Sequence, residues 1–262
     1  GTFAALKLQK GDILTELNGH KVLSMEAYGK IAGNIRSADK ISAAFIRDQK
    51  NMHASAVAVM KPYEKSELAD IQYDWVKFRQ GFIRAITRKP VNQTGMPCIL
   101  LIPGYGCGSI ENYASGYNGK LINEWLKAGY AVVTIEKSGM GDSYDCLPCS
   151  EADLVTDIES FDAGYEYMEQ LPFVDKTKLF IWGHSMGGVI APEIAKRRQP
   201  KGVMVFGTTF RPWIEFLPEM HRVQKPLLEN LNYVQTETFI RKIQQIYYEF
   251  FVLKKTREQL LN

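Results

Sequence analysis

Four short and almost wholly apolar runs constrain the fold of this chain more than any other feature. They lie at residues 98–102, 131–135, 179–182 and 203–206. Runs of this length without polar alternation are typical of strands buried on both faces of a sheet. Helical segments separate them, one around residues 121–126 and one from Ser150, where apolar residues recur at helical spacing: Leu154, Ile158, Phe161, Tyr165 and Met168. This alternation predicts an α/β fold with a doubly wound, mostly parallel sheet.

Residues 1–62 predict a separate, small β-rich domain. A short apolar run at 13–17 leads into Asn18-Gly19, a dipeptide that favours a tight hairpin turn. Ser24 is suited to cap a short helix that runs from Met25 toward Ile35. This part of the chain therefore reads as strand, turn and helix.

Two further strands complete this domain in the sequence. Residues 41–47 and 52–59 alternate between apolar and polar side chains around the polar turn 48–51. Residues 61–67 are polar, contain a proline and lack periodicity, so we interpret them as a linker. The domain boundary is predicted at residue 62.

The larger part of the chain divides into a sheet-forming segment and a helical one. Residues 71–78 and 82–87 predict an antiparallel pair that opens the core, which we assign to residues 63–210. From Arg211 onward the strand pattern stops, and five apolar residues mark one face of an amphipathic helix: Phe239, Ile243, Ile246, Phe250 and Leu253. We expect residues 211–262 to be the start of a helical cap, with the core incomplete at this end.

The motif Gly183-His184-Ser185-Met186-Gly187 lies directly between a predicted strand and a predicted helix at 188–195. A serine on a tight strand-to-helix turn is held in a strained conformation, and only glycine fits two positions to either side. The turn directs the hydroxyl out of the sheet, next to the favourable dipole of the helix N-terminus. Ser185 is therefore the predicted nucleophile, with Gly183 and Gly187 as the glycines of its turn.

The order of these parts resembles the α/β-hydrolase family, in the branch with a helical cap that includes esterases and serine aminopeptidase-like enzymes. The resemblance rests on the Ser185 motif, on residues 102–106 after one strand and on residues 136–143 after the next. All three loops fall at the carboxyl edge of the sheet, where open α/β sheets bind ligands. The family pattern implies that the backbone amides of Tyr105 and Met186 form the oxyanion hole. A plain glycine turn remains the alternative for 103–106.

The N-terminal domain resembles the later part of a bacterial-type PDZ domain. Residues 8–14 and 18–22 carry this resemblance. A complete PDZ domain binds a peptide by adding it as a strand beside its second strand, after a loop that holds the peptide carboxylate. Neither that loop nor that strand is found here. The resemblance thus implies a peptide ligand only for a complete domain, and the alternative is a structural appendage.

A serine nucleophile needs a histidine oriented by a carboxylate, and the sequence does not supply this pair. The single histidine after Ser185 is His221, which we interpret as a surface residue, and no strand fixes it or Glu215 in place. His184 is too close to Ser185 to reach its hydroxyl and is expected to line the site or pack below it. We expect the acid and the base to lie beyond residue 262, and residues 1–262 to be inactive alone.

The four cysteines do not decide whether the protein is in an oxidising or a reducing compartment. Cys98 falls in a buried strand and is expected to pack in the core. The α/β-hydrolase resemblance brings Cys107 near the loop of Cys146 and Cys149, so a disulfide is sterically feasible, with Cys149 as the candidate partner. Unpaired thiols in a reducing compartment are the alternative, and a small preference falls on the periplasm or the cell exterior. A redox pair or a zinc site at Cys146 and Cys149 is disfavoured.

Composition narrows the partners further. With 32 basic and 29 acidic residues the net charge is +3, and no basic block is interleaved with aromatics, so nucleic acid is not expected as a partner. No apolar run is long enough for a membrane span. We predict a serine hydrolase of carboxylic esters that needs no metal or organic cofactor. A peptidase or thioesterase of the same fold is the alternative, and a non-catalytic scaffold or binding protein is the rival from another class.

Overall fold

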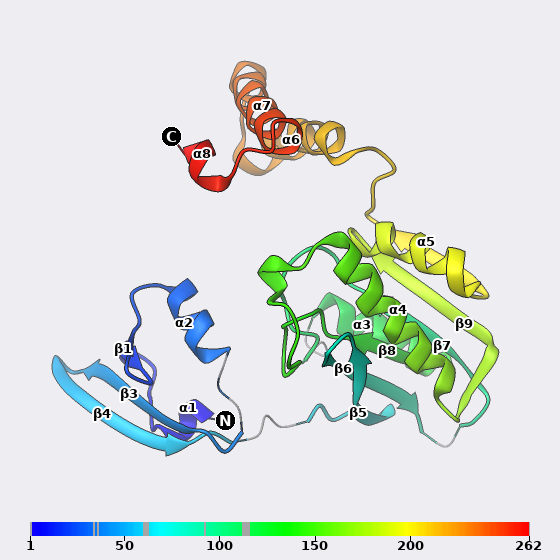
Figure 1. Cartoon of the computed structure of the whole chain (residues 1–262), viewed down its shortest axis with the longest axis horizontal. Coiled ribbons are helices and arrows are strands. Elements are labelled where there is room, and N and C mark those ends of the chain that lie inside the picture. Colours follow the sequence, from blue (N-terminus) through cyan, green and yellow to red (C-terminus); the bar gives the residue numbers. More distant parts are fainter. Residues whose placement is uncertain are drawn as a thin grey trace.

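The computed structural model describes residues 2–33, 35, 37–59, 63–91, 93–111 and 116–261 of the chain. Its elements fall into three groups along the sequence (Figure 1). A small N-terminal sheet with two helices comes first, a larger sheet flanked by helices follows, and a group of helices ends the described chain.

The N-terminal group contains a four-stranded antiparallel sheet with the order β2-β1-β3-β4. Its elements are α1 (Thr2–Ala5), β1 (Ile13–Leu17), β2 (His20–Lys21), α2 (Met25–Ala32), β3 (Lys40–Arg47) and β4 (Lys50–Val57). Leu17, Ile41 and Phe45 lie in its small buried core. The predicted strands and helix are confirmed, whereas nothing in this arrangement establishes the PDZ resemblance, which stays a prediction.

Local signals explain the turns of this group. Asn18 and Gly19 have φ values of 51° and 77°, the left-handed pair that a two-residue hairpin between β1 and β2 requires. The Ser24 hydroxyl accepts a hydrogen bond from the Ala27 amide at 3.1 Å, so the predicted helix cap is confirmed. The turn predicted at 48–51 is tighter than expected, because only Asp48 and Gln49, both with positive φ, separate β3 from β4.

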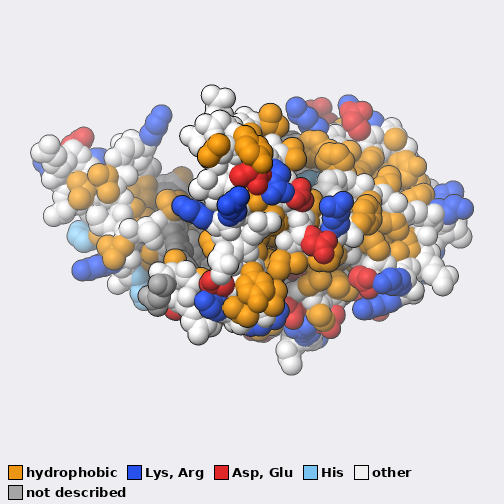
Figure 2. Space-filling model, turned by 90° about the horizontal axis from the view of Figure 1, so that it is seen from above, with side chains coloured by type: hydrophobic (Ala, Val, Ile, Leu, Met, Phe, Trp, Pro, Cys, Tyr) orange, Lys and Arg blue, Asp and Glu red, His pale blue; other side chains and the backbone are white. Residues whose placement is uncertain are grey.

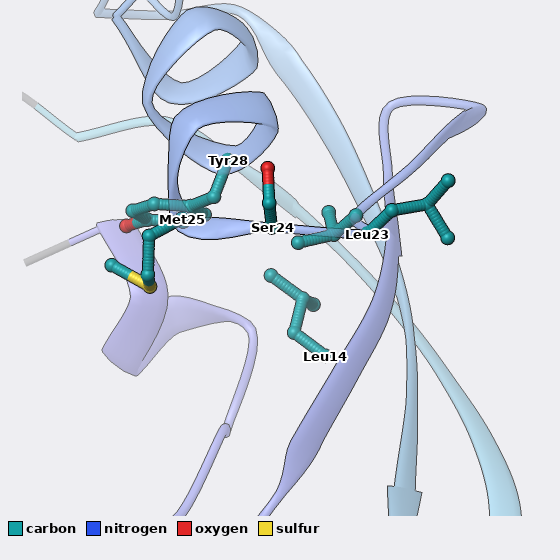
Figure 3. Close-up of a pocket in the computed structure, with 6 residues that line it drawn as sticks. Leu14, Leu23, Ser24, Met25 and Tyr28 are labelled. Carbon is teal, nitrogen blue, oxygen red and sulfur yellow. The ribbon is translucent and has the colours of Figure 1, made fainter.

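A pocket of about 490 Å³ lies between β1 and the start of α2 (Figure 3). Its lining is almost entirely apolar, with side chains from the strand, the helix and the segment between them: Leu14, Val22, Leu23, Ser24, Met25 and Tyr28. Leu23 and Met25 are 84% and 79% exposed. The pocket is therefore open to solvent.

The larger group is built on a six-stranded sheet with the order β10-β9-β7-β8-β6-β5. The strands are β5 (Ala69–Phe78), β6 (Gly81–Pro90), β7 (Met96–Ile102), β8 (Ala131–Ile135), β9 (Val174–His184) and β10 (Gly202–Phe206). The pairs β8-β7, β7-β9 and β9-β10 are parallel, while β5-β6 and β6-β8 are antiparallel. The predicted antiparallel opening and the mostly parallel sheet are both confirmed.

Helices cover both faces of this sheet. They are α3 (Tyr117–Lys127), α4 (Leu154–Gln170) and α5 (Gly187–Arg198). Alternate residues of β7 face opposite sides, so that Leu100 packs in the cluster that contains residues of α4 and α5, and Leu101 packs in the cluster that contains residues of α3. This two-sided burial is what an almost wholly apolar strand predicts.

Two details of the predicted elements are wrong. The helix expected from Ser150 starts at Leu154, because Asp153 caps it by accepting from the Thr156 amide, and Leu154 itself is 43% exposed. β10 was expected to be buried on both faces, but its apolar side chains are 38–56% exposed: Val203, Met204, Val205 and Phe206. It is the last strand of the sheet, and within the described residues its outer edge has no paired strand.

The last group contains α6 (Trp213–Glu229), α7 (Tyr233–Tyr247), a single π-helical turn (Tyr248–Val252) and α8 (Arg257–Leu261). The predicted amphipathic face is wrong in part: Ile240 is fully buried, whereas Ile246, Phe250 and Leu253 are about half exposed. α6 was not predicted, because Pro218 and Pro226 lie inside it. Seen from above the view of Figure 1, the surface shows hydrophobic side chains among the charged ones (Figure 2). Leu227 and Leu228 in α6 are 80% and 79% exposed.

Part of the predicted linker is anchored rather than solvated. Lys61 and Pro62 lie outside the described residues, but Glu64 forms two hydrogen bonds with the Arg88 guanidinium, at 2.9 and 2.5 Å. The two side chains are 8% and 1% exposed. Tyr63 also stacks on Tyr73 of β5, with 4.2 Å between the ring centroids. This segment is thus held against the sheet.

Candidate active site

Ser185 lies on a sharp turn between β9 and α5, at the carboxyl edge of the sheet. Its φ is 55°, in the left-handed region that non-glycine residues seldom adopt. Its amide donates to the carbonyl of Phe206 at the end of β10, with an N···O distance of 2.9 Å. The residue is half-buried, so part of it is accessible to solvent. These are the features that the motif predicts for an exposed hydroxyl on a strained turn.

The glycines of this turn are required by space. A Cβ at Gly183 would lie 2.2 Å from the carbonyl oxygen of Gly187, and a Cβ at Gly187 would lie 2.2 Å from the carbonyl oxygen of Ile102. Both contacts are with backbone, which has little freedom to move away. Side chains are therefore excluded at both positions, which allows β7, β9 and α5 to meet closely around Ser185.

The loop after β7 runs directly past Ser185. A Cβ at Gly104 would lie 3.1 Å from the Ser185 Cβ, so the two backbones approach closely here. In the described part of the chain, neither the Tyr105 nor the Met186 amide donates to a backbone carbonyl. The Tyr105 ring is 82% exposed and lies edge-on to Trp213 of α6, with centroids 6.3 Å apart. The Tyr105 amide belongs to this loop and the Met186 amide to the turn itself, so the two amides predicted for the oxyanion hole come from two segments of the chain.

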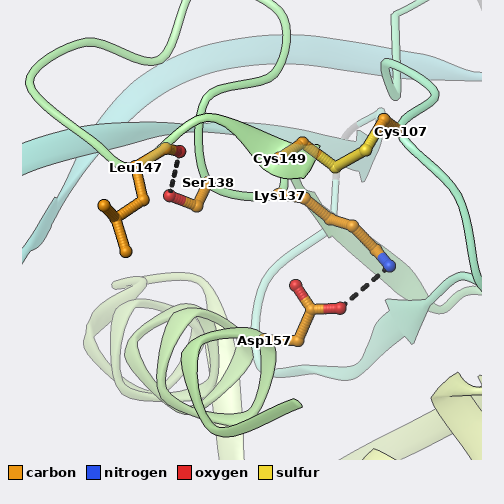
Figure 4. Close-up of a disulfide and its surroundings, with 6 residues drawn as sticks. All are labelled: Cys107, Lys137, Ser138, Leu147, Cys149 and Asp157. Atoms are coloured by element: carbon orange, nitrogen blue, oxygen red, sulfur yellow. Dashed lines mark hydrogen bonds and ion pairs between the residues drawn. A yellow bond between two sulfur atoms is a disulfide. The ribbon is translucent and has the colours of Figure 1, made fainter. Parts of the chain in front are cut away.

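A disulfide connects this loop to the segment after β8 (Figure 4). Cys107 and Cys149 are bonded, across 42 residues of sequence. Cys149 begins a short 3-10 helix, Cys149–Glu151, that precedes α4. Cys98 is a buried free thiol in β7, and Cys146 is a half-buried free thiol. The bond restricts the loop that carries Tyr105.

Charged residues directly after β8 are buried, and the sequence analysis, which used residues 136–143 for the family resemblance, assigned no role to them. Lys137 is 4% exposed and donates to Asp157 of α4 at 3.0 Å, while the Ser138 hydroxyl donates to the Leu147 carbonyl at 2.7 Å (Figure 4). Glu136 is fully buried, and burial raises the pKa of its carboxyl to about 7. One feature of the sequence could have indicated these residues: Glu136 and Lys137 are charged and directly follow the apolar run 131–135.

The histidines do not complete a catalytic triad in the described chain. His184 is stacked between the rings of Trp182 and Phe206, at 6.0 and 5.8 Å. His221, which was interpreted as a surface residue, is half-buried, and its Nε2 lies 3.0 Å from the Tyr247 hydroxyl. Glu215 is exposed in the first turn of α6, and among the described residues it forms no hydrogen bond with His221. Ser185 therefore has no histidine partner within that part of the chain.

The residues that the structure describes form neither a metal site nor a membrane-spanning helix. No group of three or more histidine, cysteine, aspartate or glutamate side chains is arranged to hold a metal ion there. Among the helices of the same residues, none has the length and apolar character to cross a bilayer.

Comparison with known families agrees with this architecture. The model of the family described as serine aminopeptidase, S33, matches residues 98–247, which is more than half of the chain. No curated protein is significantly similar in sequence.

Solved structures are similar at low sequence identity. A hypothetical protein from Pseudomonas aeruginosa has a TM-score of 0.50 and 16% identity, over 72% of this chain and 56% of that one. An α/β-hydrolase, GrgF, from Penicillium sp. sh18 has a TM-score of 0.48 and 14% identity, over 60% and 53% of the two chains. Est1E from Butyrivibrio proteoclasticus has a TM-score of 0.42 and 19% identity, over 57% and 54%. The chain spans about half the length of these structures.

Proposed function

Because this chain belongs to the serine aminopeptidase S33 family of α/β-hydrolases, we propose that it cleaves carboxylic esters through an acyl-enzyme on Ser185. The observation that carries the proposal is the turn at Ser185. The positive φ of Ser185 and the lack of space for side chains at Gly183 and Gly187 match the requirements of a nucleophile elbow. Strained backbone of this kind persists where the surrounding structure holds it, and it concentrates at functional sites.

The proposed reaction has two steps. The Ser185 oxygen attacks the acyl carbon, its proton passes to a base, and the alcohol leaves with a proton returned to it. During the attack the carbonyl oxygen becomes negative and accepts hydrogen bonds from the Tyr105 and Met186 amides. Water then attacks the acyl carbon, and the carboxylic acid is released from Ser185.

We place the acid and the histidine of this reaction on segments that pair with the outer edge of β10. The apolar side chains of β10 are exposed in residues 1–262, so a further strand at this edge would bury them. A parallel strand there would also end at the same edge of the sheet as Ser185. Both features support a base supplied from outside residues 1–262.

A fluorophosphonate probe tests the nucleophile. We expect the full-length protein to be labelled at Ser185, with labelling lost in Ser185→Ala and retained in Ser150→Ala, a control at an exposed serine near the disulfide. Mass spectrometry of the labelled peptide identifies the residue. Absence of label in the full-length protein would instead favour the non-catalytic scaffold.

The position of the base has its own test. We expect residues 1–262 alone not to turn over an activated short-chain ester, because an unassisted serine is a weak nucleophile near neutral pH. Turnover by these residues alone would contradict the proposed location of the base. A peptidase or thioesterase remains the alternative within the same chemistry, and comparing ester, thioester and peptide substrates of one acyl group separates them.

A further inference from the structure

The side chain of Glu136 connects the end of β8 to the loop after β7. One carboxyl oxygen, Oε1, accepts a hydrogen bond from the Ser109 hydroxyl, and the other, Oε2, accepts from the Ile110 amide at 3.1 Å. Ser109 and Ile110 belong to the loop that passes Ser185 at Gly104 and carries Tyr105. A single buried carboxyl thus holds the far end of the loop that contains one proposed oxyanion donor.

The space around this carboxyl is shaped by a glycine. A Cβ at Gly141 would lie 2.3 Å from Glu136 Oε1, and the φ of Gly141 is 59°. Glycine is therefore required there both for conformation and for room. The segment after β8 turns back over Glu136 at this point, so the carboxyl is enclosed between the two loops.

Two carboxylates act electrostatically on Glu136, one from each loop that encloses it. They are Glu111, on the loop after β7, and Asp142, on the segment after β8, and each raises the pKa of Glu136. Asp142 is paired with Arg84 of β6, at 2.5 Å, and the carbonyl of Arg84 accepts from the Glu136 amide. Lys137 is directed at Asp157 instead. Burial is the largest cause that raises the pKa of Glu136, and the bonds from Ser109 and Ile110 oppose it.

We propose that Glu136 is a positioning residue, whose ionised carboxyl fixes the loop after β7 so that the Tyr105 amide stays in place beside Ser185. The inference rests on the proposed function of Ser185. A carboxylate suits this task because it offers acceptors on both oxygens to two donors at once, and hydrogen bonds to a charged acceptor are stronger than neutral ones. An amide in the same place offers one acceptor and one donor.

Hydrogen exchange tests the hold on the loop. Above pH 7, where the carboxyl is ionised, we expect the Ile110 amide of Glu136→Gln, followed by NMR or in peptides covering residues 104–111, to exchange about fivefold faster than in the wild type, since a charge-assisted bond becomes a neutral one. Glu151→Gln, at an exposed position in the short helix after Cys149, is the control and should leave this rate unchanged. Unchanged exchange in Glu136→Gln would overturn the proposal. Ser109→Ala removes one donor without altering the buried acid, and should loosen the same loop if Glu136→Gln does not fold.

The pH dependence of probe labelling separates positioning from a general loss of structure. In the full-length protein we expect the ratio of Ser185 labelling rates, wild type over Glu136→Gln, to rise about tenfold as the pH increases through about 7, which is less than the cost of deleting an oxyanion donor outright. Titration of the histidine base cancels in this ratio. A ratio that stays flat while the wild type labels normally would overturn the role of Glu136 alone. A wild type that does not label would overturn the proposed function as well.

Discussion

The backbone of Ser185 occupies the left-handed region, with φ of 55°. This conformation costs a residue with a side chain about 1 kcal/mol or more. The Ser185 amide is bonded to Phe206, and the neighbouring Gly183 and Gly187 allow β9, β7 and α5 to close around it. The strain is therefore held by contacts that involve four elements, β7, β9, β10 and α5, at the edge of the sheet.

Glu136 also makes the stability of the fold depend on pH. Burial raises its pKa to about 7 from the ordinary 4.5, so the folded state binds this proton more tightly than the unfolded state. Its contribution to stability is present in full below pH 4.5 and is lost as the pH rises through about 7. We expect the free energy of unfolding to fall by roughly 3 kcal/mol between pH 4.5 and 8, relative to Glu136→Gln.

Urea denaturation of both proteins at several pH values measures this difference. The variant cannot ionise at position 136, so every other titrating group cancels in the comparison. Parallel pH profiles for the two proteins would mean that the carboxyl is not desolvated in the folded state.

β10 differs from the other strands because its apolar side chains are exposed. An unpaired apolar edge is a surface on which chains associate. In the chain of 262 residues we expect Val203→Lys to reduce self-association with a change in stability below about 1 kcal/mol, because Val203 is already 38% exposed.

The matched control for Val203→Lys is a substitution in β9, the strand that pairs with β10. Ile181 of β9 is directly opposite Val203 and fully buried, so Ile181→Lys should lose more than about 4 kcal/mol or fail to fold. Sedimentation velocity and thermal melting give the two readouts. Equal destabilisation by the two substitutions would contradict the exposure of β10.

Strands and helices of the core were predictable because the strands are short, unbroken apolar runs and the helices carry apolar residues at helical spacing. The apolar runs at 98–102 and 131–135 correspond to β7 and β8, and the Ser185 motif was placed correctly between a strand and a helix. The exposure of β10 was not predictable, since an apolar run in the sequence does not show whether other elements cover the strand. α6 was missed because prolines inside a helix look like breaks in the sequence, although Pro218 is buried within it.

The site was predictable only where the motif is local in sequence. Ser185, Gly183 and Gly187 lie within five residues, and their turn follows from that spacing alone. Glu136 is brought to Ser109 and Ile110 by the pairing of β7 with β8, and no spacing in the sequence encodes that contact. Its position directly after an apolar strand was the single available hint.

At the scale of the whole chain, the buried pair of Glu64 and Arg88 attaches the segment between the two sheets to the larger one. Removing one partner of a buried pair leaves the other charge uncompensated. We expect Glu64→Gln to destabilise the larger unit by about 3–5 kcal/mol, measured by chemical denaturation.

Another acidic residue of the same unit provides the control. Glu124 and Lys127 form an exposed pair on α3, with side chains 69% and 56% exposed, so Glu124→Gln should change stability by less than about 1 kcal/mol. Similar effects for the two substitutions would show that Glu64 is solvated and does not hold the segment against the sheet.

The pair of Glu64 and Arg88 also limits how far the two sheets can separate. Ala58 is still tied to the small sheet by hydrogen bonds with Ala38 and Asp39, and Glu64 is only six positions further along the chain. Six residues span at most about 22 Å when fully extended. A molecule bound in the pocket between β1 and α2 would consequently be kept near the hydrolase sheet at an effective concentration on the order of millimolar, without any contact between the two units.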